Sequence, residues 1–227
     1  MINEKEKGGS KYKIEYLGEK YSKELLTNKV IVLGLYGVGK EEIINKLMKK
    51  QIDNDYSPTI SVDIVNFQVK VNDKIMQIQI WDACGNDEFA LHTPNLFKNT
   101  SVALLVYDIN DKNSFEALNN WYNMLLNNSY GHTIFLIGNK NNLEKERQVT
   151  KEEGEKFKNN YNAIKMFFET SSKDGENIDK LFDNMVISIY EKNEKDQKDL
   201  VNSKNNIKAI KLNKKDHKKR KKKKWNY

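Results

Sequence analysis

The residues best suited to chemistry in this chain form a glycine-rich loop between an apolar run and an amphipathic segment. Gly34 follows the apolar residues 30–33, four residues intervene, and Gly39 and Lys40 then open the next segment. In this pattern, G-x-x-x-x-G-K, backbone N–H groups surround phosphate oxygens at a helix N-terminus and the lysine adds a positive charge. The pattern normally continues with Ser or Thr, whose hydroxyl binds magnesium, but this chain has Glu41. The loop therefore predicts a phosphate site with an altered metal ligand.

The elements that must position this loop alternate between strand-like and helix-like segments from residue 28 onward. The turn residues Asn72-Asp73 predict a hairpin, Ser114 and Thr150 are predicted helix N-caps, and Thr150 with Glu153 matches a capping box. The pattern predicts an α/β fold, with a mostly parallel six-stranded sheet, one antiparallel edge strand and about five helices. Strands are expected at residues 30–33, 61–71, 74–81, 102–107, 133–138 and 165–169, and helices at 40–52, 114–126, 151–160 and 177–191.

Charge is distributed unevenly along the 227 residues. The chain has 39 Lys and Arg against 32 Asp and Glu, yet residues 192–227 hold 15 of the basic residues and only 4 of the acidic ones. The rest of the chain is therefore mildly acidic, and only the tail has the charge to bind nucleic acid or an anionic membrane. Cys84 is the single cysteine, which excludes an internal disulfide and fits a reducing compartment.

The composition divides the chain into three expected parts. Residues 1–27 are expected to form a flexible N-terminal extension with a short helix around Tyr21–Leu26, residues 28–191 one domain, and residues 192–227 a basic, disordered tail. There is no secretion signal and no apolar run near the length of about 20 residues that spans a bilayer. We therefore expect a cytoplasmic protein.

Four further segments match a known order of motifs. They are YSPTISVD at residues 56–63, WDACG at 81–85, Asn139-Lys140, and Ser171-Ser172-Lys173. Together with the glycine-rich loop, they occur in the order and spacing of Ras-type small GTPases, and the first two resemble the Rab branch. The resemblance covers about residues 28–191. It implies the P-loop NTPase fold of a Ras-like G domain, with GTP or GDP and Mg²⁺ as its ligands.

The resemblance also implies roles for individual residues. Thr59 would bind the metal once the γ-phosphate is present, Asp82 would hold a metal-bound water, and the Gly85 N–H would meet the γ-phosphate, forming an order–disorder switch. Asn139 would bond to the purine, the Lys140 stem would lie on the base, and the Ser172 N–H would reach the purine oxygen. The predicted nucleotide-binding residues are Gly34, Gly37, Val38, Gly39, Lys40, Glu41, Glu42, Thr59, Gly85, Asn139, Lys140, Asn142, Ser171, Ser172 and Lys173, and the predicted metal ligands are Thr59, Asp82 through water, and a poorly fitting Glu41.

Several positions depart from the family's pattern around the phosphates. The Glu41 carboxylate would repel the β-phosphate, although an acid in the first helical turn also suits the helix dipole by about 0.3–1 kcal/mol. Asn86 stands where a glutamine orients the attacking water, and it is one methylene shorter. Tyr36 would crowd an arginine finger, and Ile52 replaces an aromatic ring against the base. We therefore expect Asn86 and Lys40 to be the catalytic residues of a slow GTPase with a weakened Mg²⁺ site.

Asn142 is the departure that concerns the base. The family has aspartate here, which accepts hydrogen bonds from two N–H groups of guanine. An asparagine would present a donor to the guanine amine, at a cost on the order of 1.5–3 kcal/mol, whereas the same amide matches xanthine. The sequence therefore predicts lost guanine selectivity.

Two functions from different classes follow from these residues. The first is a Rab-like switch in vesicle traffic, which meets effectors and exchange or activating proteins through residues 53–63 and 83–98. The second is a pseudo-GTPase scaffold with lost or xanthine-tolerant nucleotide binding. The chain ends without the cysteines that carry a Rab protein's prenyl anchor. The basic segment 218–225 could instead contact an anionic membrane reversibly, bind nucleic acid, direct nuclear import, or stay a solvated charge run.

Overall fold

The computed structural model describes residues 11–48, 62–83 and 94–223 of the chain. These residues divide into two units, Met1–Ile189 and Tyr190–Tyr227, and the first contains the sheet and its covering helices. Within the described residues, no helix has the length and apolar character to cross a membrane.

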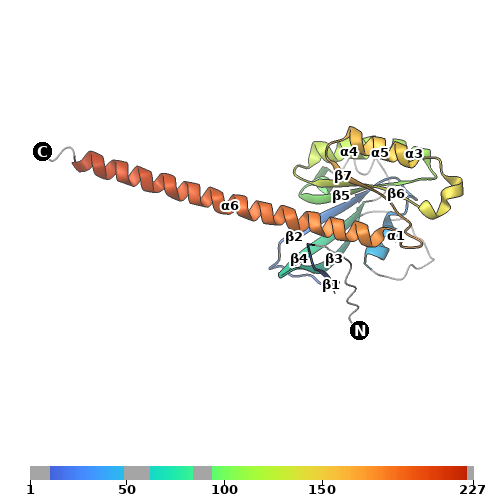
Figure 1. The fold of residues 1–227 in the computed structure, drawn as a ribbon, viewed down its shortest axis with the longest axis horizontal. Helices are drawn as coiled ribbons and strands as arrows, with labels where there is room; N and C mark the ends of the chain where they lie inside the picture. Colours follow the sequence, from blue (N-terminus) through green and yellow to red (C-terminus); the bar gives the residue numbers. More distant parts are fainter. Residues whose placement is uncertain (1–10, 49–61, 84–93, 224–227) are drawn as a thin grey trace. The chain divides into compact units, whose positions relative to one another are not determined.

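A seven-stranded sheet forms the centre of the first unit (Figure 1). Its spatial order is β1-β3-β4-β2-β5-β6-β7. Only β3 runs against its neighbours, because it pairs antiparallel with both β1 and β4 while all the other pairs are parallel. The strands are β1 (Ile14–Gly18), β2 (Thr27–Leu33), β3 (Val62–Val71), β4 (Lys74–Ala83), β5 (Thr100–Asp108), β6 (Thr133–Asn139) and β7 (Ile164–Glu169).

Helices cover both faces of this sheet. Figure 1 shows α3, α4 and α5 grouped on one face, with α1 and the first turns of α6 on the other. The first face is closed by a continuous apolar core in which Leu33 and Leu105 from the strands meet Trp121 and Phe157 from the helices, all buried. The helices are α1 (Lys40–Leu47), α3 (Lys112–Glu116), α4 (Leu118–Asn128), α5 (Lys151–Asn160) and α6 (Ile178–Lys223), with 3-10 turns η1 (Pro94–Phe97) and η2 (Asn141–Glu146).

The predicted α/β fold is confirmed, with a correction to the sheet. The strand count rises from six to seven because residues predicted as part of a flexible extension form β1. β1 pairs with β3 from Ile14 opposite Val71 to Gly18 opposite Gln68, so the antiparallel strand β3 no longer lies at the edge. The helix expected around Tyr21–Leu26 is also wrong, since these residues form a turn leading into β2.

Side chains as well as backbone hold β1 in place. The Tyr16 ring centroid lies 5.7 Å from that of Phe67 on β3 and 6.4 Å from that of Phe182 on α6. The Asn72 side chain accepts a hydrogen bond from the Lys13 N–H at 3.0 Å. Edge strands expose unpaired backbone groups, so β1 covers part of an edge that β3 would otherwise present.

Of three turn and helix-cap predictions made from local sequence, two are confirmed and one is wrong. The hairpin at Asn72-Asp73 is confirmed: Val71 pairs with Lys74, and Asn72 adopts the positive φ of 53° that such a turn requires. The capping box at Thr150 is confirmed in both of its hydrogen bonds. The N-cap at Ser114 is wrong, because Asp111 caps α3 and the buried Ser114 hydroxyl instead donates to the Asp111 carbonyl at 2.7 Å.

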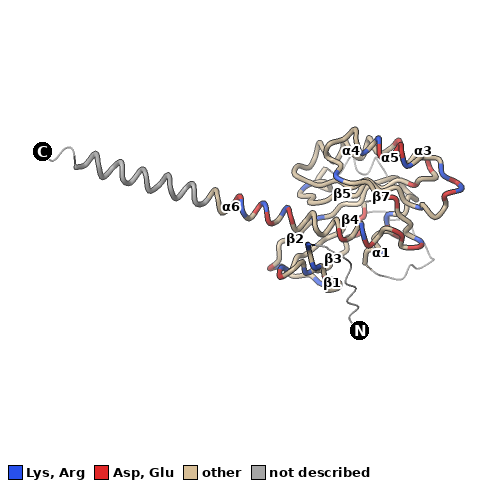
Figure 2. Tube along the Cα trace, viewed as in Figure 1, with Lys and Arg blue, Asp and Glu red and all other residues tan. Residues whose placement is uncertain are grey.

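The backbone of α6 continues as helix to Lys223, through residues 192–223 that the sequence predicted as disordered. Figure 2 shows that its described part beyond residue 190 alternates between basic and acidic residues. Mixed charges at helical spacing support helix through i,i+4 pairs, which a count of net charge ignores.

Candidate nucleotide-binding site

The glycine-rich loop joins β2 to α1, and its backbone requires glycine. Gly37 and Gly39 have φ of 78° and 90°, in the left-handed region that side chains disfavour. A Cβ atom at Gly39 would collide with the Asn139 side-chain nitrogen, and one at Gly34 would collide with the Val106 carbonyl. The loop therefore folds tightly against the ends of β5 and β6 and opens directly into the N-terminus of α1.

Lys40, the first residue of α1, is buried beneath this loop. Its Nζ atom donates hydrogen bonds of 3.0 Å to the carbonyls of Gly34 and Leu35. The ammonium thus lies among the backbone groups that the sequence predicts to surround phosphate, at a helix N-terminus that itself favours anions.

Asn139, at the end of β6, joins the loop to the segment after β7. Its Nδ2 atom donates to the Val38 carbonyl at 3.0 Å and to the Ser172 hydroxyl at 3.1 Å. Its Oδ1 atom accepts from the Ser172 N–H and from the Thr170 hydroxyl, both at 3.1 Å. A fully buried amide with four bonds fixes three separate segments in one arrangement.

Lys140 adds a second connection from the same strand end. Its backbone adopts a left-handed conformation with φ of 67°. Its ammonium pairs with the Asp108 carboxylate at 2.7 Å and donates to the Gly37 carbonyl at 2.7 Å. The stem of Lys140 therefore runs from β6 toward the phosphate loop and presents an apolar strip beside it.

Asn142, in η2, is within hydrogen-bonding distance of Ser171. Its Oδ1 atom is 3.1 Å from the Ser171 hydroxyl, which is also 3.1 Å from the Asp174 carboxylate. A hydroxyl has one proton, so Ser171 can donate to only one of these acceptors at a time. Lys173, the last residue of the predicted base segment, is exposed.

Asp82 lies where the metal is predicted to bind, and its carboxyl group has a strongly raised pKa. It lies near the end of β4, directly opposite Asp63 of β3 on the same face of the sheet. Its carboxylate is buried, and the Oδ1 atom has no hydrogen-bond partner within the described residues. Burial raises the pKa of Asp82 from 3.8 to about 7, against the opposing effect of Lys40, with Glu41, Asp63 and Glu42 raising it further.

Glu41, in the first turn of α1, has a related environment. Burial raises the pKa of its carboxyl, and the negative charges of Glu42 and Asp63 raise it further. No three acidic, histidine or cysteine side chains of the described segments converge closely enough to hold a metal by themselves. Mg²⁺ usually takes one or two carboxylates and completes its shell with water and phosphate oxygens, so the unpartnered Asp82 oxygen fits such an ion.

Several predicted site residues lie outside the described residues. They are Ile52, Thr59, Gly85 and Asn86, together with most of the predicted partner segments 53–63 and 83–98. Their roles stay predictions.

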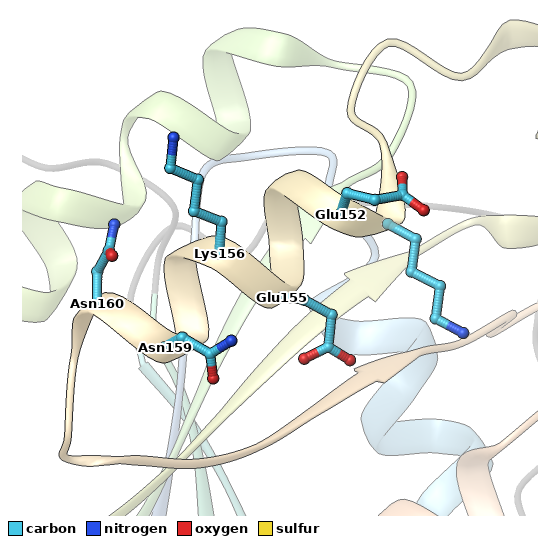
Figure 3. A pocket seen from close by; sticks show the side chains of 6 residues that line it. Glu152, Glu155, Lys156, Asn159 and Asn160 are labelled. Atoms are coloured by element: carbon cyan, nitrogen blue, oxygen red, sulfur yellow. The ribbon is translucent and has the colours of Figure 1, made fainter.

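A surface pocket lies over α5, lined by Lys151, Glu152, Glu155, Lys156, Asn159 and Asn160 (Figure 3). All six residues come from this one helix, and in Figure 3 the Lys156 and Glu155 side chains leave it in different directions. No residue of the phosphate loop or the base segments contributes. The pocket combines both signs of charge without convergence, so we assign it no chemistry.

The sequence interpretation missed two residues of the site. Asp108 pairs with Lys140, and Thr170 donates to Asn139. Both follow or end parallel strands, and ligand sites in α/β sheets form where the carboxyl ends of such strands meet. That rule, applied to β5 and β7, would have found them.

The comparison with known families agrees with this geometry. A model described as the Ras family matches residues 29–191, which is well over half of the chain. The matched range begins in β2 and contains every site residue described above. Ras-family GTPases in general bind GTP and GDP with Mg²⁺ and engage effectors and regulators. The chain therefore belongs to the Ras family and has the domain of a small GTPase switch.

Proposed function

We propose that this protein is a Rab-like switch of intracellular vesicle traffic that binds a purine nucleotide and hydrolyses it slowly. The buried Asn139 network is the observation that carries the proposal, because it joins the phosphate loop to both base segments. These bonds hold Val38 and Ser172 in the arrangement that the proposed nucleotide site requires. The segments YSPTISVD and WDACG support the Rab branch.

In this proposal each residue of the described site has a distinct task. The N–H groups around Gly37 and Gly39 bind phosphate oxygens, and Lys40 exchanges loop carbonyls for phosphate. Asn139 and the Ser172 N–H orient the purine, while the Lys140 stem covers one face of it. Asp82, through water, and Thr59, which lies outside the described residues, would hold Mg²⁺, and the ion would supply positive charge against the phosphates.

The acidic surroundings of the metal side support slow turnover and weak metal retention. Burial is the main cause of the raised pKa values of Glu41 and Asp82, and the negative charges of Glu42 and Asp63 raise both further. A β-phosphate would bring further negative charge to the same place. Exposed Tyr36 and the shortened Asn86 point the same way, because they concern the arginine finger and the attacking water.

The alternative, a pseudo-GTPase with altered base preference, is favoured by one observation at the base segment. When the Ser171 hydroxyl donates to the Asn142 amide oxygen rather than to Asp174, the Asn142 NH₂ group is the part left to face a base. An NH₂ donor opposes the guanine amine but matches the carbonyl of xanthine.

The metal part of the proposal is tested with Glu41→Ser. Restoring the hydroxyl should increase Mg²⁺-dependent nucleotide affinity by tenfold or more, measured by titration calorimetry on nucleotide-stripped protein. Glu152→Ser is the matched control, because Glu152 is likewise the second residue of its helix, α5. This substitution removes the same interaction with a helix dipole. Equal responses of the two variants would contradict an effect specific to the metal.

The base part is tested with Asn142→Asp. We expect the ratio of GTP to XTP affinity to rise at least tenfold, because the carboxylate accepts two hydrogen bonds from guanine. Asn184→Asp, at a half-buried asparagine on α6, makes the same charge change at a position outside the predicted site. An unchanged ratio in Asn142→Asp would show that this position does not read the base.

We further propose that residues 218–225 attach the protein reversibly to endomembranes from the cytoplasm. Seven consecutive basic residues followed by Trp225 support this, at about 1 kcal/mol per basic residue near an anionic surface. Cosedimentation with phosphatidylserine vesicles at low and high salt tests it. Equal binding to neutral vesicles would contradict the electrostatic origin.

A further inference from the structure

Asp174 is an acidic residue beside the base segments that the proposed nucleotide chemistry does not use. It directly follows Ser171-Ser172-Lys173 in the sequence. Its backbone N–H donates to the Ser171 hydroxyl at 2.9 Å, and one of its carboxylate oxygens lies 3.1 Å from the same hydroxyl. The Asn142 amide oxygen lies 3.1 Å from that hydroxyl as well. The Ser171 hydroxyl therefore joins Asp174 to the residue that is predicted to read the base.

The Ser171 hydroxyl has a fixed position and a restricted choice of partners. Ser171 is 1% exposed, so its hydroxyl is shielded from water. The next residue, Ser172, is held by the bond from its N–H to the buried Asn139 side chain. Within the described residues, the acceptors that the Ser171 hydroxyl can reach are the Asp174 carboxylate and the Asn142 amide oxygen. The single Ser171 proton must go to one of these two oxygens.

The carboxylate is the stronger of the two acceptors. A hydrogen bond to an ionised group is about twice as strong as one between neutral groups, so Ser171 donates to Asp174. The Asn142 oxygen would then face the hydroxyl oxygen, acceptor against acceptor. Half a turn of the exposed Asn142 amide exchanges its two ends and brings the NH₂ group to Ser171. The hydroxyl then donates once, accepts from the Asp174 N–H and the Asn142 NH₂, and leaves no mismatched contact.

A simpler explanation is that Ser171 and Asp174 only close the turn after β7. The turn does have its own bonds, since the Gly175 N–H donates to the Ser171 carbonyl at 2.7 Å and the Asp174 N–H donates to the Ser171 hydroxyl. Both of these bonds use Ser171 as an acceptor and the backbone N–H of residues 174 and 175 as donors. They are independent of the Asp174 carboxylate, whose effect on the Ser171 proton comes in addition to the turn.

We propose that Asp174 is a positioning residue for base recognition, which takes the Ser171 proton and thereby turns the Asn142 amide oxygen toward the base. The inference rests on the proposed nucleotide function, because the base belongs to the proposed ligand. An amide oxygen accepts a hydrogen bond from the ring N–H that guanine and xanthine share, so both bases are tolerated. Without the Asp174 carboxylate, Ser171 donates to Asn142, and the NH₂ group that then faces the base opposes the guanine amine but matches the xanthine carbonyl.

The test measures GDP and XDP affinities of nucleotide-stripped, full-length Asp174→Ala protein by titration calorimetry. The ratio of GDP to XDP affinity should fall on the order of tenfold, because one hydrogen bond to guanine is replaced by a clash. Asp179→Ala, at an exposed acid in the first turn of α6, should leave the ratio unchanged. Asp174→Ala should also leave it unchanged in an Asn142→Asp background, because the two oxygens of a carboxylate are equivalent and have no orientation to lose. An equal loss of GDP and XDP affinity, or the same fall of the ratio in the Asn142→Asp background, overturns the inference.

A second measurement needs no nucleotide and separates this inference from the proposed function. The side-chain NH₂ signals of Asn142 are assigned in NMR spectra by their loss in Asn142→Asp. In wild type the NH₂ group bonds to Ser171, so its exchange with water should be slower than in Asp174→Ala on the order of tenfold. Equal exchange in both proteins overturns the orientation. If wild-type protein binds no purine nucleotide, the proposed function fails, while this exchange still decides the orientation. Should Asp174→Ala fail to fold, Asp174→Asn removes the charge at the same size and must shift both measurements in the same direction.

Discussion

Replacing Asp82 by asparagine is expected to stabilise the metal-free, nucleotide-free protein at pH 8. The carboxylate is buried and one of its oxygens has no partner within the described residues, which raises its pKa from 3.8 to about 7. That difference corresponds to about 4 kcal/mol of unfavourable free energy once the group is ionised. An asparagine leaves an unbonded polar group that costs about 1–3 kcal/mol. The expected net gain is therefore about 1–3 kcal/mol.

The gain must depend on pH in a defined direction. The folded protein binds the Asp82 proton more tightly than the unfolded chain, so this group's contribution to stability is fully present below pH 3.8. It is lost as the pH rises toward about 7, the folded-state pKa. The asparagine variant lacks this dependence. The raised pKa of Glu41 acts in the same direction, but the Glu41 carboxyl is present in both proteins.

Urea denaturation between pH 4.5 and 8.5 in the presence of a chelator measures the difference. Asp179→Asn, at an exposed position in the first turn of α6, is the control for loss of one carboxylate. The free energy of unfolding of Asp82→Asn relative to wild type should increase from pH 4.5 to about pH 7 and then level off. A difference in unfolding free energy that stays constant over this pH range would refute the raised pKa of Asp82.

Two further predictions concern positions fixed by the fold. Gly39→Ala should lower the free energy of unfolding by about 1–3 kcal/mol and weaken nucleotide binding, because φ of 90° disfavours alanine and its Cβ would displace Asn139. Thermal unfolding with and without nucleotide measures both effects. A variant that unfolds and binds like wild type would contradict the loop geometry. Tyr16→Ala should cost about 1–2 kcal/mol in urea denaturation, because its ring packs against Phe67 and Phe182; an unaffected midpoint would mean that β1 does not dock in solution.

The central strands could be predicted from the sequence because their own residues carry the signal. The runs at residues 103–106 in β5 and 134–137 in β6 are apolar throughout. β1 gave no such signal: IEYLG is short, ends in glycine and is only half-buried, so its stability depends on pairing with β3. Pairing between distant segments is not encoded in a local pattern.

The site shows the same division between local and distant determinants. The glycines and Lys40 could be predicted because one short loop contains them all. The bond between Lys140 and Asp108 could not, because it joins residues brought together by strand order. Ser114 shows that neighbouring residues compete for the same role. Asp111, three residues earlier, is the N-cap of α3, and the Ser114 hydroxyl donates to the Asp111 backbone carbonyl instead.

The central claim is that this Ras-family domain still binds a purine nucleotide despite Glu41 and Asn142. Titration calorimetry of nucleotide-stripped full-length protein with GTP, GDP, XTP and XDP, each with Mg²⁺ and with chelator, tests it most directly. The account predicts saturable binding that strengthens with Mg²⁺, with xanthine nucleotides bound at least as tightly as guanine nucleotides. Absence of binding to all four, in protein whose fold is intact by circular dichroism, would contradict it.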